Sequence, residues 1–505
     1  MKTNFLIATL TSLLIFNSCD LEEYPYGFYS ENNFYKTEAD AQSAVLYIYD
    51  AINYIEYSRS IVFLGDMNTD EMNPKGDCAA ATKELDAWKL NNFKTNSTLA
   101  NFYKYSYITI NRANAVIKMV PGMTIDEAVK NQYLGEAYFM RGYSYFNLAR
   151  NFGRVPIHTI PVETLEQTAV PIAESLDAMW QLIIDDLTSA SKLMAYYTKP
   201  ITGRVDRAAA YGLLAKAYLY IASAKEHGAP QYAQMTFDVN EYYAEAVKQA
   251  GYVVDNSEQT TYGFENNLLD IYDVNKPTGS EHLFLMSMDR TGESEGQYSK
   301  ISKMYLPYVS GATIYLKQGD GDSMIPTHDG WGEYQTNLTF YNSFEVGDRR
   351  HDWLIVDKVF NANGDEIASV ADGKLNYPFC RKFIDPNFAG DKTSTRPFLL
   401  RYSDIALTYA EAAGPTPKAY ELVNIVRTRA GLGTLKPGMS LPEFRKAIFD
   451  ERYFELAYEG DRCYDLRRWN RLHTDITEAK GQGLSAEQMV FYPIPSVETD
   501  LNPNI

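Results

Sequence analysis

The chain has 505 residues, and its 65 acidic and 47 basic side chains give a net charge of −18 at pH 7. Such an acidic body argues against nucleic acid as a partner, because binding to a phosphate backbone depends on Lys and Arg. With 45% hydrophobic and 22% charged residues and no linker-like or low-complexity tract, the composition predicts one large folded body.

The N-terminus has the features of an export signal. Lys2 precedes an apolar run over 5–16, which is shorter than the roughly 20 residues of a membrane-spanning helix. Ser18 and Cys19 follow, and this pattern resembles a bacterial lipoprotein signal, in which cleavage exposes the cysteine for acylation. We therefore predict a signal peptide over 1–18, lipidation at Cys19 and a membrane-tethered single domain over 19–505. An ordinary signal peptide with Cys19 as a bystander is the alternative.

Apolar residues then recur at helical spacing through most of the chain. Thr124 and Glu127 form a capping-box pattern opening a long helix that stops at Gly153. Asp206 and Thr416 are placed to cap two further helices. Paired helices rich in Ala, Tyr and Leu predict a mainly α fold of tetratricopeptide-like repeats over about 38–252 and 401–472. The predicted helices cover 38–57, 99–120, 124–153, 172–194, 206–228, 240–250, 402–412, 417–430 and 441–459.

Residues 253–400 interrupt this helical pattern with Gly, Asn, Asp and Pro between short β-like runs. Residues 282–288 read as a strand, and the runs 353–360 and 366–370 flank an Asn-Gly turn that predicts a hairpin. A long loop-rich insertion in a helical chain is typical of a binding region. We therefore expect the ligand site in this insertion.

Two motifs invite a catalytic interpretation. Residues 292–296 match GxSxG, but a nucleophile elbow needs an alternating α/β sheet, and glutamates flank this serine on both sides. Glu451, Glu455 and Glu459 share one helix face, but several arginines lie close in sequence and would lower the carboxyl pKa values, the wrong direction for a general acid. We interpret the first motif as an acidic surface loop and the second as a structural ion-pair network.

No metal or cofactor site is predicted. The six histidines are scattered, the four cysteines have no CxxC spacing, and the acidic turn at 317–322 lacks the EF-hand pattern.

Aromatic residues in loop-rich regions are the stronger candidates. Trp331 lies between two glycines with Tyr334 close by and Tyr305 upstream, and Trp88 and Asp70 belong to another loop-rich region. Aromatic faces can stack on sugar rings while polar neighbours bond the hydroxyl groups. The alternative is that each ring merely packs the loops against the helices. For the set we favour a binding platform.

The order of six segments resembles the SusD/RagB family of surface lipoproteins of Bacteroidetes-type bacteria. The segment 450–470, DERYFELAYEGDRCYDLRRWN, carries the strongest resemblance. The others are 136–156, 203–222, 401–412, 422–432 and 492–503. Cys463 departs from the family pattern, in which a bulkier residue is frequent.

The resemblance implies a tetratricopeptide-like helical protein with an irregular region that carries most of the ligand site. Such proteins face outward on the outer membrane, over a TonB-dependent transporter of the SusC type, and deliver oligosaccharides to it without catalysis. The acids that follow Cys19 resemble the tag that directs these lipoproteins to the cell surface. By position, the resemblance implies ligand contacts from Asp70, Trp88, Tyr305, Trp331 and Tyr334.

Two alternatives stay open at this point. A peptide-capturing lipoprotein of the RagB branch would have fewer exposed tryptophans and a more charged cavity. A surface glycosidase would need two carboxylates converging in a cleft away from arginine.

Overall fold

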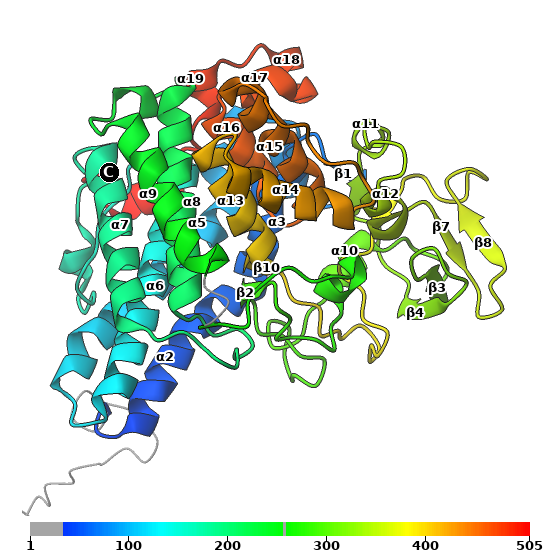
Figure 1. Cartoon of the computed structure of the whole chain (residues 1–505). Helices are drawn as coiled ribbons and strands as arrows, with labels where there is room; N and C mark the ends of the chain where they lie inside the picture. Colours follow the sequence, from blue (N-terminus) through cyan, green and yellow to red (C-terminus); the bar gives the residue numbers. More distant parts are fainter. Residues whose placement is uncertain (1–33, 256–258) are drawn as a thin grey trace, which may run out of the picture.

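Helices make up most of the structure, a computed structural model that describes residues 34–255 and 259–505. Figure 1 shows the helices gathered into one body, with short strands and loops projecting from one side. The prediction of a mainly α fold is confirmed. The signal peptide predicted over 1–18 and the lipidation site predicted at Cys19 lie outside the described residues.

Long helices form the body and pack largely in chain order. They are α2 (Glu38–Asn53), α5 (Ser97–Met119), α6 (Glu127–Phe152), α7 (Leu176–Leu193), α8 (Arg207–Glu226), α9 (Val239–Val254), α13 (Tyr402–Ala413), α14 (Pro417–Arg429) and α15 (Leu441–Glu455). Each helix from α5 to α8 contacts the next, and α13 packs against both α9 and α8. The chain therefore leaves the helical body after α9 and returns beside it.

Small residues let the central helices approach one another. A Cβ added at Gly142 of α6 would lie 3.1 Å from the Leu187 side chain of α7, and one added at Gly212 of α8 would lie 3.0 Å from Ile405 of α13. α8 is buried on almost all sides, which explains its alanine-rich sequence.

Two of the three capping residues predicted from the sequence, Asp206 and Thr416, are confirmed. The Asp206 side chain accepts from the backbone N–H of Ala209, and Thr416 accepts from Ala419. The capping box predicted at Thr124 and Glu127 is wrong. α6 begins two residues later than a Thr124 cap allows, because the Asp126 carboxylate accepts from two backbone N–H groups at the helix start.

The last long helix ends earlier than predicted. α15 stops at Glu455 instead of 459, since Tyr458 has a φ of 64° and Gly460 a φ of 87°, which no right-handed helix accommodates. The chain then turns back into a short helix.

Short strands β2 to β10 lie between α9 and α13, and β1 follows η1 near the start of the chain. The largest sheet has the order β4-β3-β7-β8, and three two-stranded pairs join β1 to β5, β2 to β10 and β6 to β9. The predicted hairpin at Asn363-Gly364 is confirmed as β7–β8. The strand predicted over 353–360 is wrong at its start, because a short helix ends at Leu354. The strands are β1 (Met72–Pro74), β2 (His282–Leu285), β3 (Thr313–Lys317), β4 (Met324–His328), β5 (Tyr334–Thr336), β6 (Ile355–Val356), β7 (Lys358–Phe360), β8 (Glu366–Ser369), β9 (Phe379–Cys380) and β10 (Phe398–Arg401).

Short helices complete the chain. They are α3 (Ile55–Val62), η1 (Phe63–Met67), α4 (Ala80–Asp86), η2 (Leu90–Thr95), η3 (Val120–Gly122), η4 (Leu165–Thr168), η5 (Tyr232–Gln234), η6 (Leu268–Tyr272), α10 (Ile301–Tyr305), α11 (Leu338–Tyr341), α12 (Arg349–Leu354), α16 (Arg462–Arg468), α17 (Leu472–Asp475), α18 (Thr477–Gln482), α19 (Ala486–Met489) and α20 (Ser496–Leu501).

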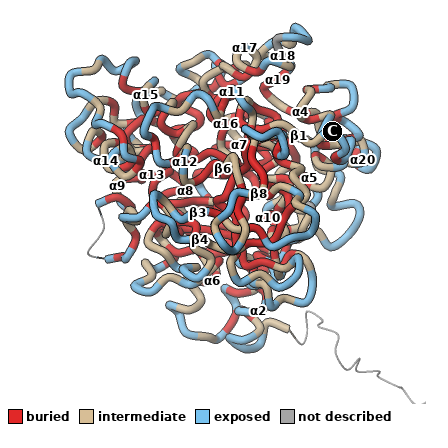
Figure 2. The backbone as a smooth tube through the Cα atoms, turned by 90° about the vertical axis from the view of Figure 1, so that its right-hand side faces the viewer, coloured by how far each residue is buried: buried red, intermediate tan, exposed pale blue. Residues whose placement is uncertain are grey.

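Buried residues run through the whole interior in Figure 2, and exposed residues follow the outer loops. The largest hydrophobic cluster fills the helical body. A second cluster, the junction core, joins the insertion to η1 and the end of α15. It consists of Val62, Met67, Met72, Leu268, Ile271, Tyr272, Ile301, Met304, Tyr305, Tyr334, Phe340, Leu354, Ile355, Cys380, Phe383, Phe398, Ala457 and Tyr458.

Three further features bear on function. Across residues 34–255 and 259–505, the helices are too short or too polar to cross a membrane. In the same residues no group of His, Cys, Asp or Glu side chains could hold a metal ion. Cys78, Cys380 and Cys463 are buried free thiols.

Candidate functional site

The fold joins the two loop regions in which ligand residues were predicted. β1, which follows η1, pairs with β5 of the insertion, and Met72 lies opposite Thr336. The backbone N–H of Lys75 donates to the Glu333 carbonyl at 2.9 Å, which extends this connection beyond the strands. Segments more than 250 positions apart in the sequence therefore lie side by side in one two-stranded sheet.

Trp88 does not belong to that surface. Its side chain is about 1% exposed, its Nε1–H donates to the Asn68 carbonyl at 3.0 Å, and its ring stacks on Tyr492 with centroids 5.9 Å apart. The prediction that Trp88 contacts ligand is wrong in this structure, because its partner from the end of the chain covers the ring.

Tyr305 and Tyr334 are also core residues. Each is about 1% exposed, and their rings meet edge to face at 5.1 Å inside the junction core. Tyr305 stacks on Phe383 from its other side. The prediction of ligand contact is wrong for both, because α10 and β5 turn their rings inward.

Asp70 is partly exposed but paired. Its carboxylate accepts two hydrogen bonds from Arg462, at 2.8 and 2.7 Å, and that guanidinium stacks over the Tyr453 ring. This bidentate pair fixes the loop after η1 against α16. A ligand contact from Asp70 stays a prediction.

Trp331 is half-buried, packs against the junction core, and is held by a rigid turn. Its backbone N–H donates to the Lys303 carbonyl at 2.7 Å. The backbone N–H groups of Gly330 and Gly332 donate to the carbonyls of Pro307 and Leu306, respectively. A Cβ added at Gly330 would overlap the Leu306 carbonyl, and Gly332 has a φ of 61°. Both glycines are therefore required to place the indole.

Beside this turn, Tyr308 is 69% exposed. Its loop is fixed by the Asp329 carboxylate, which accepts from the N–H groups of Val309 at 3.3 Å and Gly311 at 2.7 Å. We call the surface formed by this loop, the Trp331 turn and the end of β1 the Trp331 surface. It comprises Asn73, Lys75, Tyr308, Trp331, Glu333 and Gln335.

Donors and acceptors are mixed on the Trp331 surface. Burial raises the pKa of Glu333, while Arg59 and Lys75 oppose this shift. The paired strands and the adjoining loops thus carry amide, ammonium, carboxylate and aromatic side chains, and groups of these kinds bind sugar hydroxyls and sugar faces.

A hollow of about 710 Å³ lies at the end of the β3–β4 hairpin that is remote from the Trp331 turn. We call it the Trp353 cleft. Its polar and aromatic lining consists of Asn267, Asp270, Tyr272, Asp273, Asn275, Gln318, Asp320, Trp353 and Arg381. The sequence interpretation missed this cleft, because its residues come from four separate segments and only the turn at 317–322 carried a local signal.

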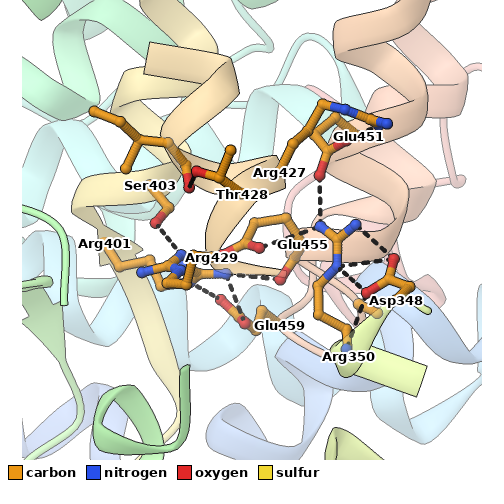
Figure 3. Close-up of polar contacts among 12 residues, drawn as sticks. Asp348, Arg350, Arg401, Ser403, Arg427, Thr428, Arg429, Glu451, Glu455 and Glu459 are labelled. Carbon is orange, nitrogen blue, oxygen red and sulfur yellow. Dashed lines mark hydrogen bonds and ion pairs between the residues drawn. The ribbon is translucent and has the colours of Figure 1, made fainter. Parts of the chain in front are cut away.

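Glu451, Glu455 and Glu459 lie in a buried ion-pair network, shown in Figure 3. Glu455 accepts from Arg401 at 2.9 Å, Arg429 at 2.8 Å and Arg350 at 3.3 Å. Glu451 is bound by Arg350 at 2.6 Å, and Glu459 by Arg401 at 2.6 Å.

Electrostatics keep Glu455 ionised. Burial alone would raise the pKa of Glu455, but Arg429, Arg401 and Arg350 outweigh it and hold that pKa well below its usual range. A general acid for glycoside hydrolysis needs the opposite shift. These acids connect α15 to β10, α14 and α12, as the sequence interpretation of a structural network predicted.

Comparison with protein families gives two matches in different parts of the chain. Residues 356–505 match the SusD family, and residues 30–219 match a family described as starch-binding and associating with the outer membrane.

Individual proteins are similar over nearly the whole chain. SusD-like protein P2 of Formosa agariphila is 24% identical, covering 100% of this chain and 98% of the relative. A SusD homologue of Bacteroides thetaiotaomicron has the same fold, with a TM-score of 0.75 at 21% identity over 94% of this chain and 98% of that one. A laminarin-binding SusD-like protein superposes with a TM-score of 0.72 at 22% identity, over 92% of this chain and 98% of that one.

Proposed function

Because the chain belongs to the SusD/RagB family, we propose that it captures oligosaccharides at the cell surface and delivers them to a SusC-like TonB-dependent transporter in the outer membrane. The observation that carries the proposal is the Trp331 surface. It presents a tryptophan on a turn locked by two glycines, next to an exposed tyrosine and hydrogen-bonding groups of both kinds.

The rigidity of this surface favours binding. A ligand that meets a preformed aromatic platform loses less free energy to ordering than one that must organise a loop. The laminarin-binding protein with the same fold supports a saccharide as ligand, since laminarin is itself a glucan.

We further propose that cleavage after residue 18 leaves Cys19 for lipidation at the membrane. Residues 19–505 then form one domain whose insertion, 253–400, carries the site. The protein acts without catalysis, which agrees with the ionised, arginine-bound state of Glu455.

Peptide capture is the second candidate, and two observations favour it. Trp88 is buried, so fewer tryptophans are exposed than the sequence suggested, and the Trp353 cleft is lined by several charged groups. A glycan ligand and a peptide ligand are distinguished by the binding experiment below.

The test is isothermal titration calorimetry of the protein comprising residues 20–505 against plant, microbial and host glycans and a peptide pool. Trp331→Ala is expected to weaken binding of the active glycan by at least about tenfold, or about 1.4 kcal/mol. Tyr252→Ala is the control, because it removes a ring that is 43% exposed from α9 in the helical body. Binding of peptides alone would replace the glycan proposal, and release of shortened sugars would reveal an enzyme.

A further inference from the structure

Arg381 in the Trp353 cleft is a buried cation. Its side chain lines the cleft and the residue is 5% exposed. Within residues 34–255 and 259–505 its guanidinium forms no ion pair, and the hydrogen bond that it makes is a donation to the Lys317 carbonyl. By contrast, the buried Arg350, Arg401 and Arg429 each contact at least two carboxylates.

Burial of an unpaired charge is costly unless a partner is supplied. Burial lowers the pKa of Arg381 to about 10, and no aspartate of the cleft offsets this shift. Arg467 also lacks a carboxylate partner in the described part of the chain, but its guanidinium lies over the Tyr492 ring and borders a hollow of only about 10 Å³. Arg381 instead borders a volume large enough for a sugar unit.

The acids of the cleft already have donors. Asp320 accepts from the Trp353 Nε1–H at 2.9 Å, Asp270 pairs with Lys276 at 2.6 Å, and Asp273 accepts from the N–H of Asn275 at 2.9 Å. They therefore line the cleft without neutralising Arg381.

Backbone pairing fixes both recognition groups. The N–H of Arg381 donates to the Leu354 carbonyl at 2.9 Å, directly after the β6–β9 pair. Trp353 is half-buried, with the Arg349 guanidinium over its ring, and its Nε1–H donates to the Asp320 carboxylate at 2.9 Å. The cleft thus offers a fixed aromatic edge and a fixed cation.

We propose that the Trp353 cleft is a second binding site, which takes an anionic saccharide with its carboxylate or sulfate group on Arg381 and a sugar ring on Trp353. Arginine suits both groups, because its planar N–H donors match two oxygens at once. The proposal rests on the proposed function only in taking a saccharide as ligand, since it does not use the Trp331 surface.

The two sites are separate. The β3–β4 pair Thr313–His328 lies next to the Trp331 turn, and the pair Lys317–Met324 lies next to the cleft. Four residue steps along a strand place these ends roughly 13 Å apart. A ligand of several sugar units could reach both.

The experiment is calorimetry with the protein comprising residues 20–505 and two matched probe pairs. One pair is a galacturonic acid oligomer and its neutral methyl ester, and the other is a sulfated galactan oligosaccharide and its desulfated form. We expect at least tenfold tighter binding of one anionic probe than of its neutral partner, weakening with salt. The pair that shows the difference identifies the anion as carboxylate or sulfate.

Variants locate the effect. Arg381→Gln is expected to abolish the anionic preference, whereas Trp331→Ala should leave it intact and weaken only binding at the Trp331 surface. If Arg381→Gln fails to fold, Trp353→Ala decides, with a tenfold loss of the anionic probe expected. Equal binding of both members of each pair, or an anionic preference that survives these cleft variants, overturns the proposal. Loss of neutral glycan binding in Trp331→Ala tests the first site independently.

Discussion

At the scale of single residues, the Trp331 turn depends on space that only glycine leaves. The oxygen of Leu306 occupies the position where a side chain at Gly330 would begin, and the same carbonyl accepts from the Gly332 N–H. The position of the indole is therefore set by backbone atoms of a neighbouring loop.

Gly330→Ala is accordingly expected to destabilise the protein by about 1–3 kcal/mol, because the overlap is with backbone and must move the turn. Glycan affinity should also fall, because the same movement displaces the Trp331 indole. Gly433→Ala is the matched control, since a Cβ there meets nothing within 4 Å. Urea unfolding and calorimetry measure the two effects, and an unchanged midpoint for Gly330→Ala would contradict the packing described.

The direction of a side chain in a loop was the hardest feature to predict. Trp88, Tyr305 and Tyr334 lie in the expected loop regions, yet their rings pack into the core. Trp88 stacks on Tyr492, about four hundred positions away, and no local pattern reveals such a partner. The glycines around Trp331 were a local signal, and of the four aromatic residues predicted to contact ligand Trp331 is the one that remains accessible.

At the scale of helices and strands, local capping chemistry determines where an element begins. One carboxylate oxygen of Asp126 accepts from two backbone N–H groups in the first turn of α6, whereas Thr124 precedes the helix. Apolar periodicity predicted the long helices well, because burial of one face repeats over many turns. Their ends depend on single residues. The strand predicted to begin at 353 begins later, because Asp348 caps a helix that continues to Leu354.

Asp126→Ala should therefore cost about 0.5–2 kcal/mol of stability, since it leaves two backbone N–H groups at the start of α6 without a protein acceptor. Thr124→Ala serves as the comparison and is expected to change the free energy of unfolding by less than about 0.5 kcal/mol. Thermal or denaturant unfolding decides, and a larger effect at Thr124 would restore the capping box.

At the scale of the whole molecule, the network around Glu455 binds the helical body to the insertion. Arg350 comes from α12, Arg401 from β10 and Arg429 from α14, and all three meet one carboxylate of α15 (Figure 3). The order of charged residues in the 450–470 segment signalled this network, but its partners from the insertion could not be identified from the sequence alone.

Stability should consequently fall in acid. The pKa of Glu455 is lower in the folded than in the unfolded chain, so its contribution is complete above the unfolded value near 4.5 and is lost as the pH falls below it. Glu455→Gln should lower the free energy of unfolding by about 3–5 kcal/mol at pH 7, because it removes a negative charge that three buried arginines share. The difference in stability between the variant and the unsubstituted protein should become smaller below about pH 4.5.

Unfolding measured between pH 3 and 7 tests this dependence, with Glu421→Gln as control. Glu421 forms an exposed pair with Lys418 at 3.3 Å and should change stability by less than about 1 kcal/mol. A deficit for Glu455→Gln that stays constant down to pH 3 would show that the carboxylate charge does not stabilise the fold.

The return of the chain beside α9 has an evolutionary consequence. The Tyr402 hydroxyl donates to the Val254 carbonyl at 3.2 Å. The insertion therefore leaves the helical body and rejoins it at neighbouring positions. Such a segment can diverge or lengthen while the scaffold is kept, provided that its anchoring contacts stay in place: Glu281 with Arg401 and Arg429, and Arg350 with Glu451 and Glu455. Selection for new nutrients could then change the insertion between α9 and α13, while the packing of the helices stays the same.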